Sequence, residues 1–120
     1  MNYTDIFVLG SLDNVKQAVQ QAFEYNKFKV QWQSDFAGKA TKGTKGMNIA
    51  FGAFAQYYEI DFQTMSARDG SIALRLIQSN TGWAGGIMGA SKVKKQYGDM
   101  VNGLSGYFQG QGIYKGSATG

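Results

Sequence analysis

The sequence predicts a single α+β domain in which an antiparallel meander sheet carries two amphipathic helices on one face. Three observations support this class. The chain has 120 residues, 43% of them hydrophobic, which is enough for one buried core and too little for two independent ones. Two segments repeat apolar residues at helical spacing, whereas the others are short and strand-like. Because the connections between the later strands are short, consecutive strands should pair antiparallel, in the order β-α-β-β-β-β-α.

The chain begins with a short strand followed by the first helix. Residues 5–9 (DIFVL) are the predicted strand, which ends at Gly10. Ser11 is a typical N-cap, since its side-chain oxygen can accept a hydrogen bond from a free backbone N–H of the first helical turn. The helix is expected over residues 12–25. Its apolar face consists of Leu12, Val15, Ala18, Val19, Ala22 and Phe23.

Four further strands are predicted between the two helices. They cover residues 27–34, 38–44, 56–66 and 71–78. The first, third and fourth of these alternate apolar and polar residues with a period of two, as half-buried strands do. An Asp-Gly turn within residues 67–70 joins the last two into a hairpin. Across this hairpin, Arg75 is predicted to pair with Glu59 or Asp61 on the solvent face.

A second amphipathic helix is predicted from Ser91 onward. Its apolar face contains Val93, Tyr97, Met100, Val101, Leu104, Tyr107 and Phe108. Glycines at positions 98, 103 and 106 each lower its helix propensity by roughly 1 kcal/mol relative to alanine, so packing against the sheet must hold this helix. We expect the domain to span residues 1–114 and the tail, residues 115–120, to be disordered.

The composition argues against several classes of chemistry. The chain contains neither Cys nor His, which removes disulfides, thiol and imidazole catalysis, and the usual zinc and copper ligands. No candidate nucleophile has a neighbouring base, and the few acidic residues are predicted to face solvent. We therefore predict a protein that is not an enzyme and that uses no cofactor and no metal.

The net charge and the glycine-rich motifs argue against nucleic acids, dinucleotides and nucleotide phosphates as partners. A net charge of +4 and a pI near 9.3 favour anions only slightly. Lys39, Lys42 and Lys45 are interpreted as protection of an exposed strand, so nucleic-acid binding is not expected. The stretch GWAGGIMG lacks the G-x-G-x-x-G spacing of dinucleotide sites, and FAGKATKG lacks the Ser or Thr that follows Gly-Lys in phosphate loops.

No targeting or membrane-spanning segment is recognised. The N-terminus lacks a basic stretch followed by an apolar one, so a cytoplasmic location is expected. The uncharged runs are shorter than the roughly 18 apolar residues that a transmembrane helix needs.

Two apolar, glycine-rich segments are predicted to lie at the same end of the sheet. Alternate connections of an antiparallel meander share an end, so segments 43–55 and 79–90 lie where the strand 27–34 begins, here named end A. Their large apolar residues are Met47, Ile49, Phe51, Phe54, Trp83, Ile87 and Met88. A basic collar around them is predicted from Lys45, Lys92, Lys94 and Lys95, with Lys27 and Lys42 at the same end.

We predict that end A contacts an apolar partner, namely a lipid, a membrane surface or a hydrophobic small molecule. The apolar residues would make the contact and the lysines would meet anionic groups. A protein–protein interface, with homo-oligomerisation as its simplest form, would use the same surface. A third alternative is that both segments fold back as lids over the domain's own core. The glycines favour contact with another molecule, because each adds an entropy cost and no buried area to a lid.

Overall fold

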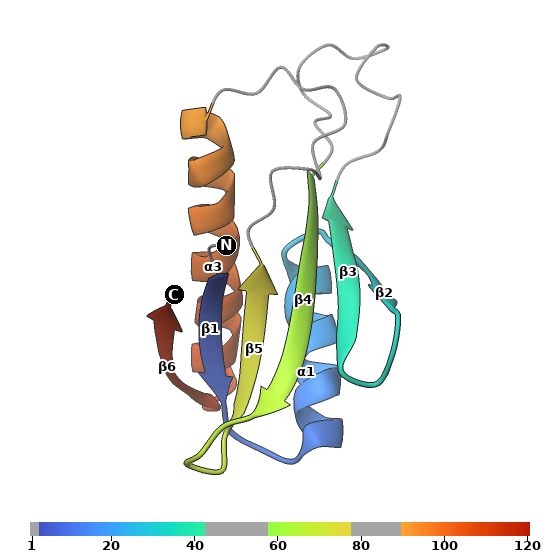
Figure 1. Ribbon diagram of the computed structural model, residues 1–120, viewed down its shortest axis with the longest axis vertical. Helices are drawn as coiled ribbons and strands as arrows, with labels where there is room; N and C mark the ends of the chain where they lie inside the picture. The colour runs from blue at the N-terminus through green and yellow to red at the C-terminus, as the bar shows by residue number, and fades with distance from the viewer. Residues whose placement is uncertain (1–2, 43–57, 78–89) are drawn as a thin grey trace.

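The structure confirms the predicted fold class and adds a strand at the C-terminus (Figure 1). This computed structural model describes residues 3–42, 58–77 and 90–120, with side chains from residue 94 onward in the last range. Its elements are β1 (Tyr3–Val8), α1 (Leu12–Tyr25), β2 (Lys29–Trp32), β3 (Ala37–Lys42), β4 (Tyr58–Ser66), β5 (Ile72–Ile77), α3 (Ala90–Gly110) and β6 (Tyr114–Thr119). The strands of the described residues form one antiparallel sheet in the order β2-β3-β4-β5-β1-β6.

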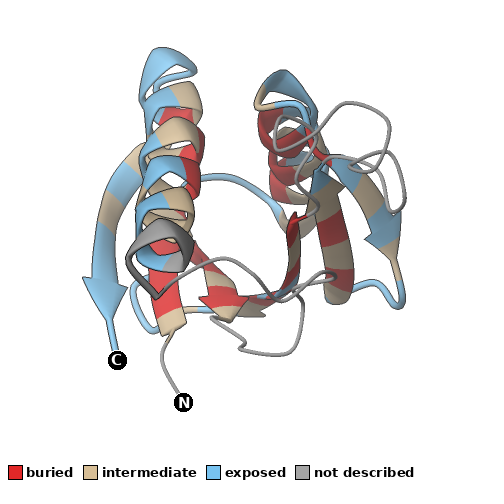
Figure 2. Cartoon of the chain, turned by 90° about the horizontal axis from the view of Figure 1, so that it is seen from above, coloured by how far each residue is buried: buried red, intermediate tan, exposed pale blue. Residues whose placement is uncertain are grey.

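Both helices pack on the same face of the sheet, where the core lies (Figure 2). The strand β4 shows why, because its alternate residues Tyr58, Ile60, Phe62 and Thr64 are buried. The intervening residues of β4 are intermediate or exposed, so the predicted period of two is confirmed. The helices contribute Val15, Val19, Ala22, Phe23, Met100, Leu104 and Phe108 to this core.

The helix α1 begins and ends where the sequence predicts. The Ser11 side chain accepts a hydrogen bond from the backbone N–H of Asn14, which is the predicted N-cap. At the other end, Lys27 has a φ of 72°, and the backbone N–H of Phe28 donates to the carbonyl of Phe23. This is a Schellman ending, and the rings of Phe23 and Phe28 make its usual apolar contact at 5.6 Å.

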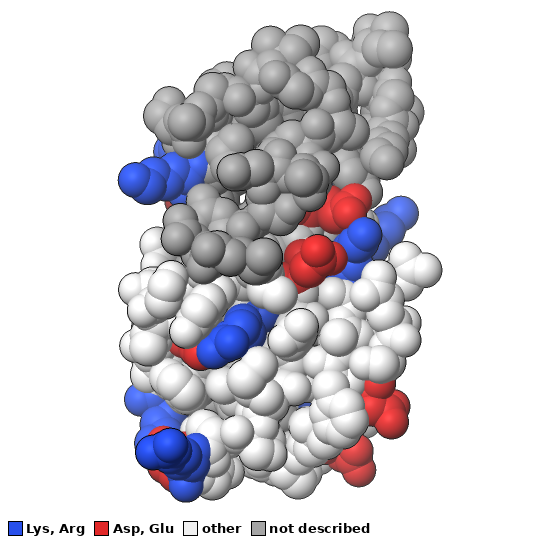
Figure 3. All heavy atoms as spheres, in the orientation of Figure 1, with Lys and Arg blue, Asp and Glu red and all other residues white. Residues whose placement is uncertain are grey.

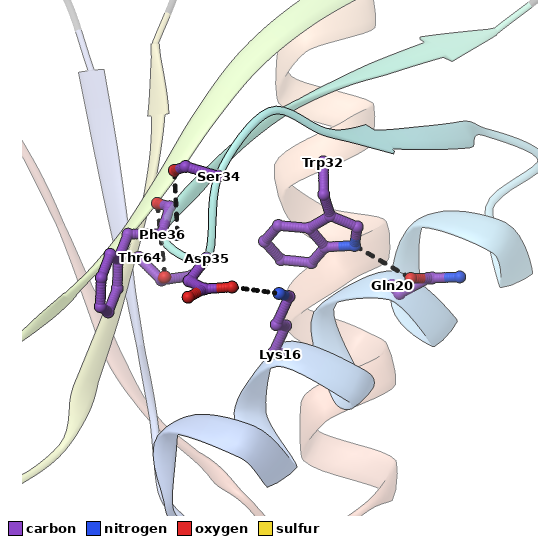
Figure 4. Close-up of polar contacts among 7 residues, drawn as sticks. All are labelled: Lys16, Gln20, Trp32, Ser34, Asp35, Phe36 and Thr64. Atoms are coloured by element: carbon purple, nitrogen blue, oxygen red, sulfur yellow. Dashed lines mark hydrogen bonds and ion pairs between the residues drawn. The ribbon is translucent and has the colours of Figure 1, made fainter.

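Polar contacts around Trp32 connect the hairpin formed by β2 and β3 to α1 (Figure 4). The indole Nε1 of Trp32 donates to Oε1 of Gln20 at 2.9 Å, and the Nζ atom of Lys16 lies 4.7 Å from the indole centroid. Lys16 also reaches Asp35 in the turn between the two strands, at 3.5 Å. One helical face therefore positions both the strand and its turn.

The helix α3 is held to the sheet by its buried face and by one partly buried hydroxyl. The hydroxyl of Tyr97 lies 2.9 Å from Oγ1 of Thr4 and 3.0 Å from the carbonyl oxygen of Leu76. These contacts connect α3 to β1 and β5 in the middle of the sheet. They supply the packing that the glycine-rich sequence of α3 requires.

The prediction of a disordered tail over residues 115–120 is wrong. This segment forms most of β6, which pairs with β1 along the edge of the sheet. Further backbone hydrogen bonds extend the pairing, from Leu9 to Ile113 and between Gly120 and Tyr3. Lys115 also forms an ion pair with Asp69 in the β4–β5 turn. The small polar residues of the tail carry no periodic signal, and the free backbone edge of β1 determines their conformation.

The predicted pairing of Arg75 with Glu59 or Asp61 is also wrong. Arg75 donates two hydrogen bonds of 2.9 Å to the carboxylate of Asp5 on β1. Its guanidinium lies 3.8 Å from the ring centroid of Tyr3, and the hydrogen bonds to Asp5 raise the pKa of Arg75. The reason is the register, which places Arg75 between Asp5 and Gln63.

The outer face of the sheet carries charges of both signs side by side (Figure 3). The ion pairs on β1, β3, β4 and β5 are Asp5 with Arg75 and Lys39 with Glu59. Such mixed charge differs from the single-sign surface that is typical of nucleic-acid binding.

Replacing Gly106 by alanine is expected to stabilise the protein, whereas replacing Gly103 is expected to destabilise it. A Cβ at Gly106 meets nothing within 4 Å, so the substitution should add roughly 0.5–1 kcal/mol of stability through helix propensity. A Cβ at Gly103 would collide with the side chain of Asn26 at the end of α1. Urea denaturation of both variants checks this pair. Equal stability of the two would contradict the close approach of α3 to α1 at Gly103.

Candidate binding pocket

The elements that flank the two apolar segments meet at one end of the sheet (Figure 1). There β3 ends at Lys42, β4 begins at Tyr58, β5 ends at Ile77 and α3 begins at Ala90. The helix α1 also ends at this end of the sheet, and β2 begins there. The directions of the flanking strands are therefore those that the sequence predicts for end A.

Most of the residues predicted to make contacts at end A lie outside the described residues. They are Lys45, Met47, Ile49, Phe51, Phe54, Trp83, Ile87 and Met88. The backbone of Lys92 is part of α3, but its side chain is not described. Lys94 and Lys95 are exposed in the first turns of α3, and Lys95 forms an ion pair with Asp99.

A pocket of about 300 Å³ lies at end A, between the end of α1, the first half of α3 and the adjoining ends of β3 and β4. Its lining residues are Asn26, Phe28, Lys42, Tyr58, Gln96, Asp99 and Met100. The volume is at the lower limit of small-molecule sites, which suits a compact ligand. The α1–β2 connection, β3, β4 and α3 all contribute to it, so the fold as a whole sets its shape.

Three buried side chains form the apolar floor of the pocket. Phe28, Tyr58 and Met100 are only 5%, 4% and 4% exposed. The rings of Phe28 and Tyr58 meet edge to face at 5.9 Å. Burial raises the pKa of Tyr58 far above its ordinary value, and the nearby Tyr97 raises it further. The hydroxyl of Tyr58 therefore stays neutral, and the floor carries no charge.

Charged side chains at the rim come from opposite walls. The Nζ atom of Lys42, at the end of β3, lies 5.6 Å from the ring centroid of Phe28. Lys42 has no ion pair with any residue of the described ranges. On the α3 side, Asp99 is held by Lys95 at 3.0 Å. The charge of Asp99 is thus balanced locally, whereas that of Lys42 is not.

One hydrogen-bond acceptor in the wall has no partner. The side-chain oxygen Oε1 of Gln96 is buried and makes no hydrogen bond within the described part of the chain. An unpaired buried acceptor costs roughly 1–3 kcal/mol relative to a paired one. A ligand or a water molecule with an O–H or N–H group would recover this free energy.

The polar side chain of Asn26 has a fixed place in the wall. Its Nδ2 atom donates to the carbonyl of Ala22 at 2.8 Å, while its Oδ1 atom contacts Gly103 of α3. Only glycine at this position of α3 leaves room for Asn26. The Schellman ending of α1 then turns the chain so that Phe28 enters the floor.

Sequence reasoning missed most of the pocket. Phe28 and Tyr58 fall within the alternating strands predicted over residues 27–34 and 56–66, Met100 is on the predicted apolar face of the second helix, and Lys42 is predicted to lie at end A. No sequence pattern indicates a role in the pocket for Asn26, Gln96 or Asp99. The strand directions could have placed Phe28 and Tyr58 together at end A, but the position of α3 above them depends on tertiary packing.

No protein-family model and no curated protein matches the chain. Among the described side chains, no group of three acidic residues is arranged to hold a metal ion. Neither helix, as far as the structure describes them, is long and apolar enough to cross a bilayer. Function is therefore inferred from the chemistry of the pocket itself.

Proposed function

We propose that this protein is a non-catalytic binding domain that takes a small amphipathic molecule into the pocket at end A. The observation that carries the proposal is the combination of an uncharged apolar floor with a buried, unpartnered acceptor in the wall. The floor of Phe28, Tyr58 and Met100 would cover an apolar group. Gln96 Oε1 would accept a hydrogen bond from a hydroxyl or amine of the ligand.

The absence of catalysis is part of the proposal, and the chemistry of the lining supports it. The titratable side chains there are Lys42, Tyr58 and Asp99. The Tyr58 hydroxyl is neutral at pH 7 even at its ordinary pKa, which burial raises further, and Asp99 is engaged by Lys95. Such groups orient and select a ligand more readily than they exchange protons with it.

The sequence predictions for segments 43–55 and 79–90 are compatible with this function. Segment 43–55 lies between β3 and β4 in the sequence, and segment 79–90 leads into α3, and these three elements all contribute lining residues. Contact of these segments with a lipid surface, or homo-oligomerisation through them, stays a prediction of the sequence. So does the cytoplasmic location.

A neutral probe tests the proposal. 1,2-Octanediol carries an eight-carbon chain and two hydroxyl groups, and its size suits a pocket of about 300 Å³. Ten non-hydrogen atoms at about 0.4–0.5 kcal/mol each correspond to a Kd of about 0.2–1 mM. Isothermal titration calorimetry should detect this binding, and the signals of the Met100 methyl and the Gln96 side-chain amide should shift in NMR spectra.

A pair of tryptophan variants provides the control. Gln96→Trp should fill the pocket and abolish the binding of 1,2-octanediol. Asn102→Trp places the same side chain on an exposed position of the same helix and should leave binding unchanged. If the diol does not bind to the unmodified protein, or if Gln96→Trp and Asn102→Trp bind it equally well, the proposed function is wrong.

A further inference from the structure

The pocket has an unbalanced positive charge directly beside its apolar floor. Lys42 Nζ lies 5.6 Å from the ring centroid of Phe28, whose side chain is 5% exposed. No carboxylate of the described residues pairs with Lys42. The other charged group of the lining, Asp99, is paired with Lys95 at 3.0 Å. A bound molecule therefore meets a net cation at the rim.

The effect of such a cation on a ligand depends on the sign of the ligand head group. A carboxylate near an ammonium gains a charge-assisted hydrogen bond, which is stronger than a bond between neutral groups. The apolar floor lowers the local dielectric constant and strengthens this attraction. A second ammonium at the same place would be repelled. Lys42 therefore distinguishes between ligands that have the same apolar group.

The unpartnered acceptor restricts the head group further. Gln96 Oε1 gains nothing from a carboxylate oxygen, because both are acceptors. A ligand that satisfies Lys42 and Gln96 at once must carry an anion together with a neutral donor. The simplest such head is a carboxylate with a hydroxyl or an amide N–H on a neighbouring carbon.

Building on the proposed function, we infer that the pocket selects amphipathic hydroxy acids or related monoanions with a neighbouring N–H donor. The anion contacts Lys42, the donor bonds to Gln96 Oε1, and the alkyl or aryl part covers the floor of Phe28, Tyr58 and Met100. Neutral and cationic molecules of the same size bind more weakly.

Three probes that differ only in one group test this inference. 2-Hydroxyoctanoate, 1,2-octanediol and 1-amino-2-octanol share the chain and the hydroxyl, and they end in an anion, a neutral group and a cation. We expect 2-hydroxyoctanoate to bind at least about fivefold more tightly than the diol, and the amine to bind more weakly than both. The preference should shrink when the salt concentration rises from about 0.05 to 0.5 M.

Two lysine variants assign the preference to its source. Lys42→Gln should reduce the affinity for 2-hydroxyoctanoate to that of the diol, and it should leave the affinity for the diol unchanged. Lys29→Gln removes an exposed lysine at the start of β2, at the same end of the sheet, that does not line the pocket, and it should retain the preference. Circular dichroism should confirm that both variants are folded.

The outcomes separate this inference from the proposed function. Equal affinities for the diol and 2-hydroxyoctanoate would overturn the anion selectivity and leave the binding function standing. Equal effects of Lys42→Gln and Lys29→Gln would show that general charge, and not Lys42, attracts the anion, which also overturns it. Absence of binding by all three probes would overturn both.

Discussion

Replacing Phe62 by alanine is expected to reduce the free energy of unfolding by about 3–5 kcal/mol. Phe62 is fully buried in β4, and its ring lies 5.0 Å from that of Phe23 and 5.1 Å from that of Trp32. It thus joins α1 to both β2 and β4 in the middle of the core. The substitution removes these contacts and leaves a cavity that the surrounding sheet cannot close. Domains of this size are typically stable by 5–15 kcal/mol, so much of the stability would be lost.

The matched control for this substitution is Phe36→Ala. Phe36 is 53% exposed. Its contact with the sheet is made by its backbone carbonyl, which accepts a hydrogen bond from the N–H of Thr64. Its truncation should change stability by no more than about 0.5 kcal/mol. Urea denaturation followed by circular dichroism measures both variants. A loss at Phe62 as small as that at Phe36 would contradict the central position of Phe62.

The elements that could be predicted from the sequence are those whose own residues carry the signal. The helix α1 has a capping serine and an apolar face, and the structure has both. The alternation in β4 is read correctly because one face of the strand is buried and the residues of the other face are intermediate or exposed. Local patterns of this kind determine which side of an element faces the core.

The errors in the fold have a single physical origin, which is the place of β1 in the sheet. A meander accounts for the pairing of each strand with the next from β2 through β5. It gives no position for the first strand, β1. β1 lies between β5 and β6, so its Asp5 is available to Arg75 and its free edge can order the tail. Both facts depend on pairing between residues far apart in the chain, which periodicity does not report.

The candidate site shows the same division between local and tertiary information. Strand directions predict correctly that the flanking elements converge at end A, because the parity of an antiparallel meander follows from the order of its strands. The pocket itself also needs Gln96 and Asn26, whose roles arise only where α3 crosses the end of α1. A buried acceptor without a partner, such as Gln96 Oε1, has no signature in a sequence.

Gly38 in β3 is expected to be irreplaceable, since alanine at this position should reduce the free energy of unfolding by about 1–3 kcal/mol. A Cβ there would lie 2.7 Å from Cζ of Phe62 and 2.8 Å from the backbone oxygen of Gln31. Gly38 is paired with Trp32 on one side and Phe62 on the other, and the two rings meet over it edge to face. An added methyl group would separate these rings and push β2 away from β3.

Gly116→Ala is the control, because this glycine is also in a strand, β6, and a Cβ there meets nothing within 4 Å. It should be neutral or slightly stabilising. The double variant Gly38→Ala with Phe62→Ala should lose less stability than the sum of the two single variants, because removal of the ring relieves one of the two clashes. If the stability losses of the two single variants were strictly additive, the destabilisation by Gly38→Ala would come from the clash with the Gln31 backbone oxygen alone. A Gly38→Ala protein as stable as Gly116→Ala would show that the two rings do not need the space above this glycine.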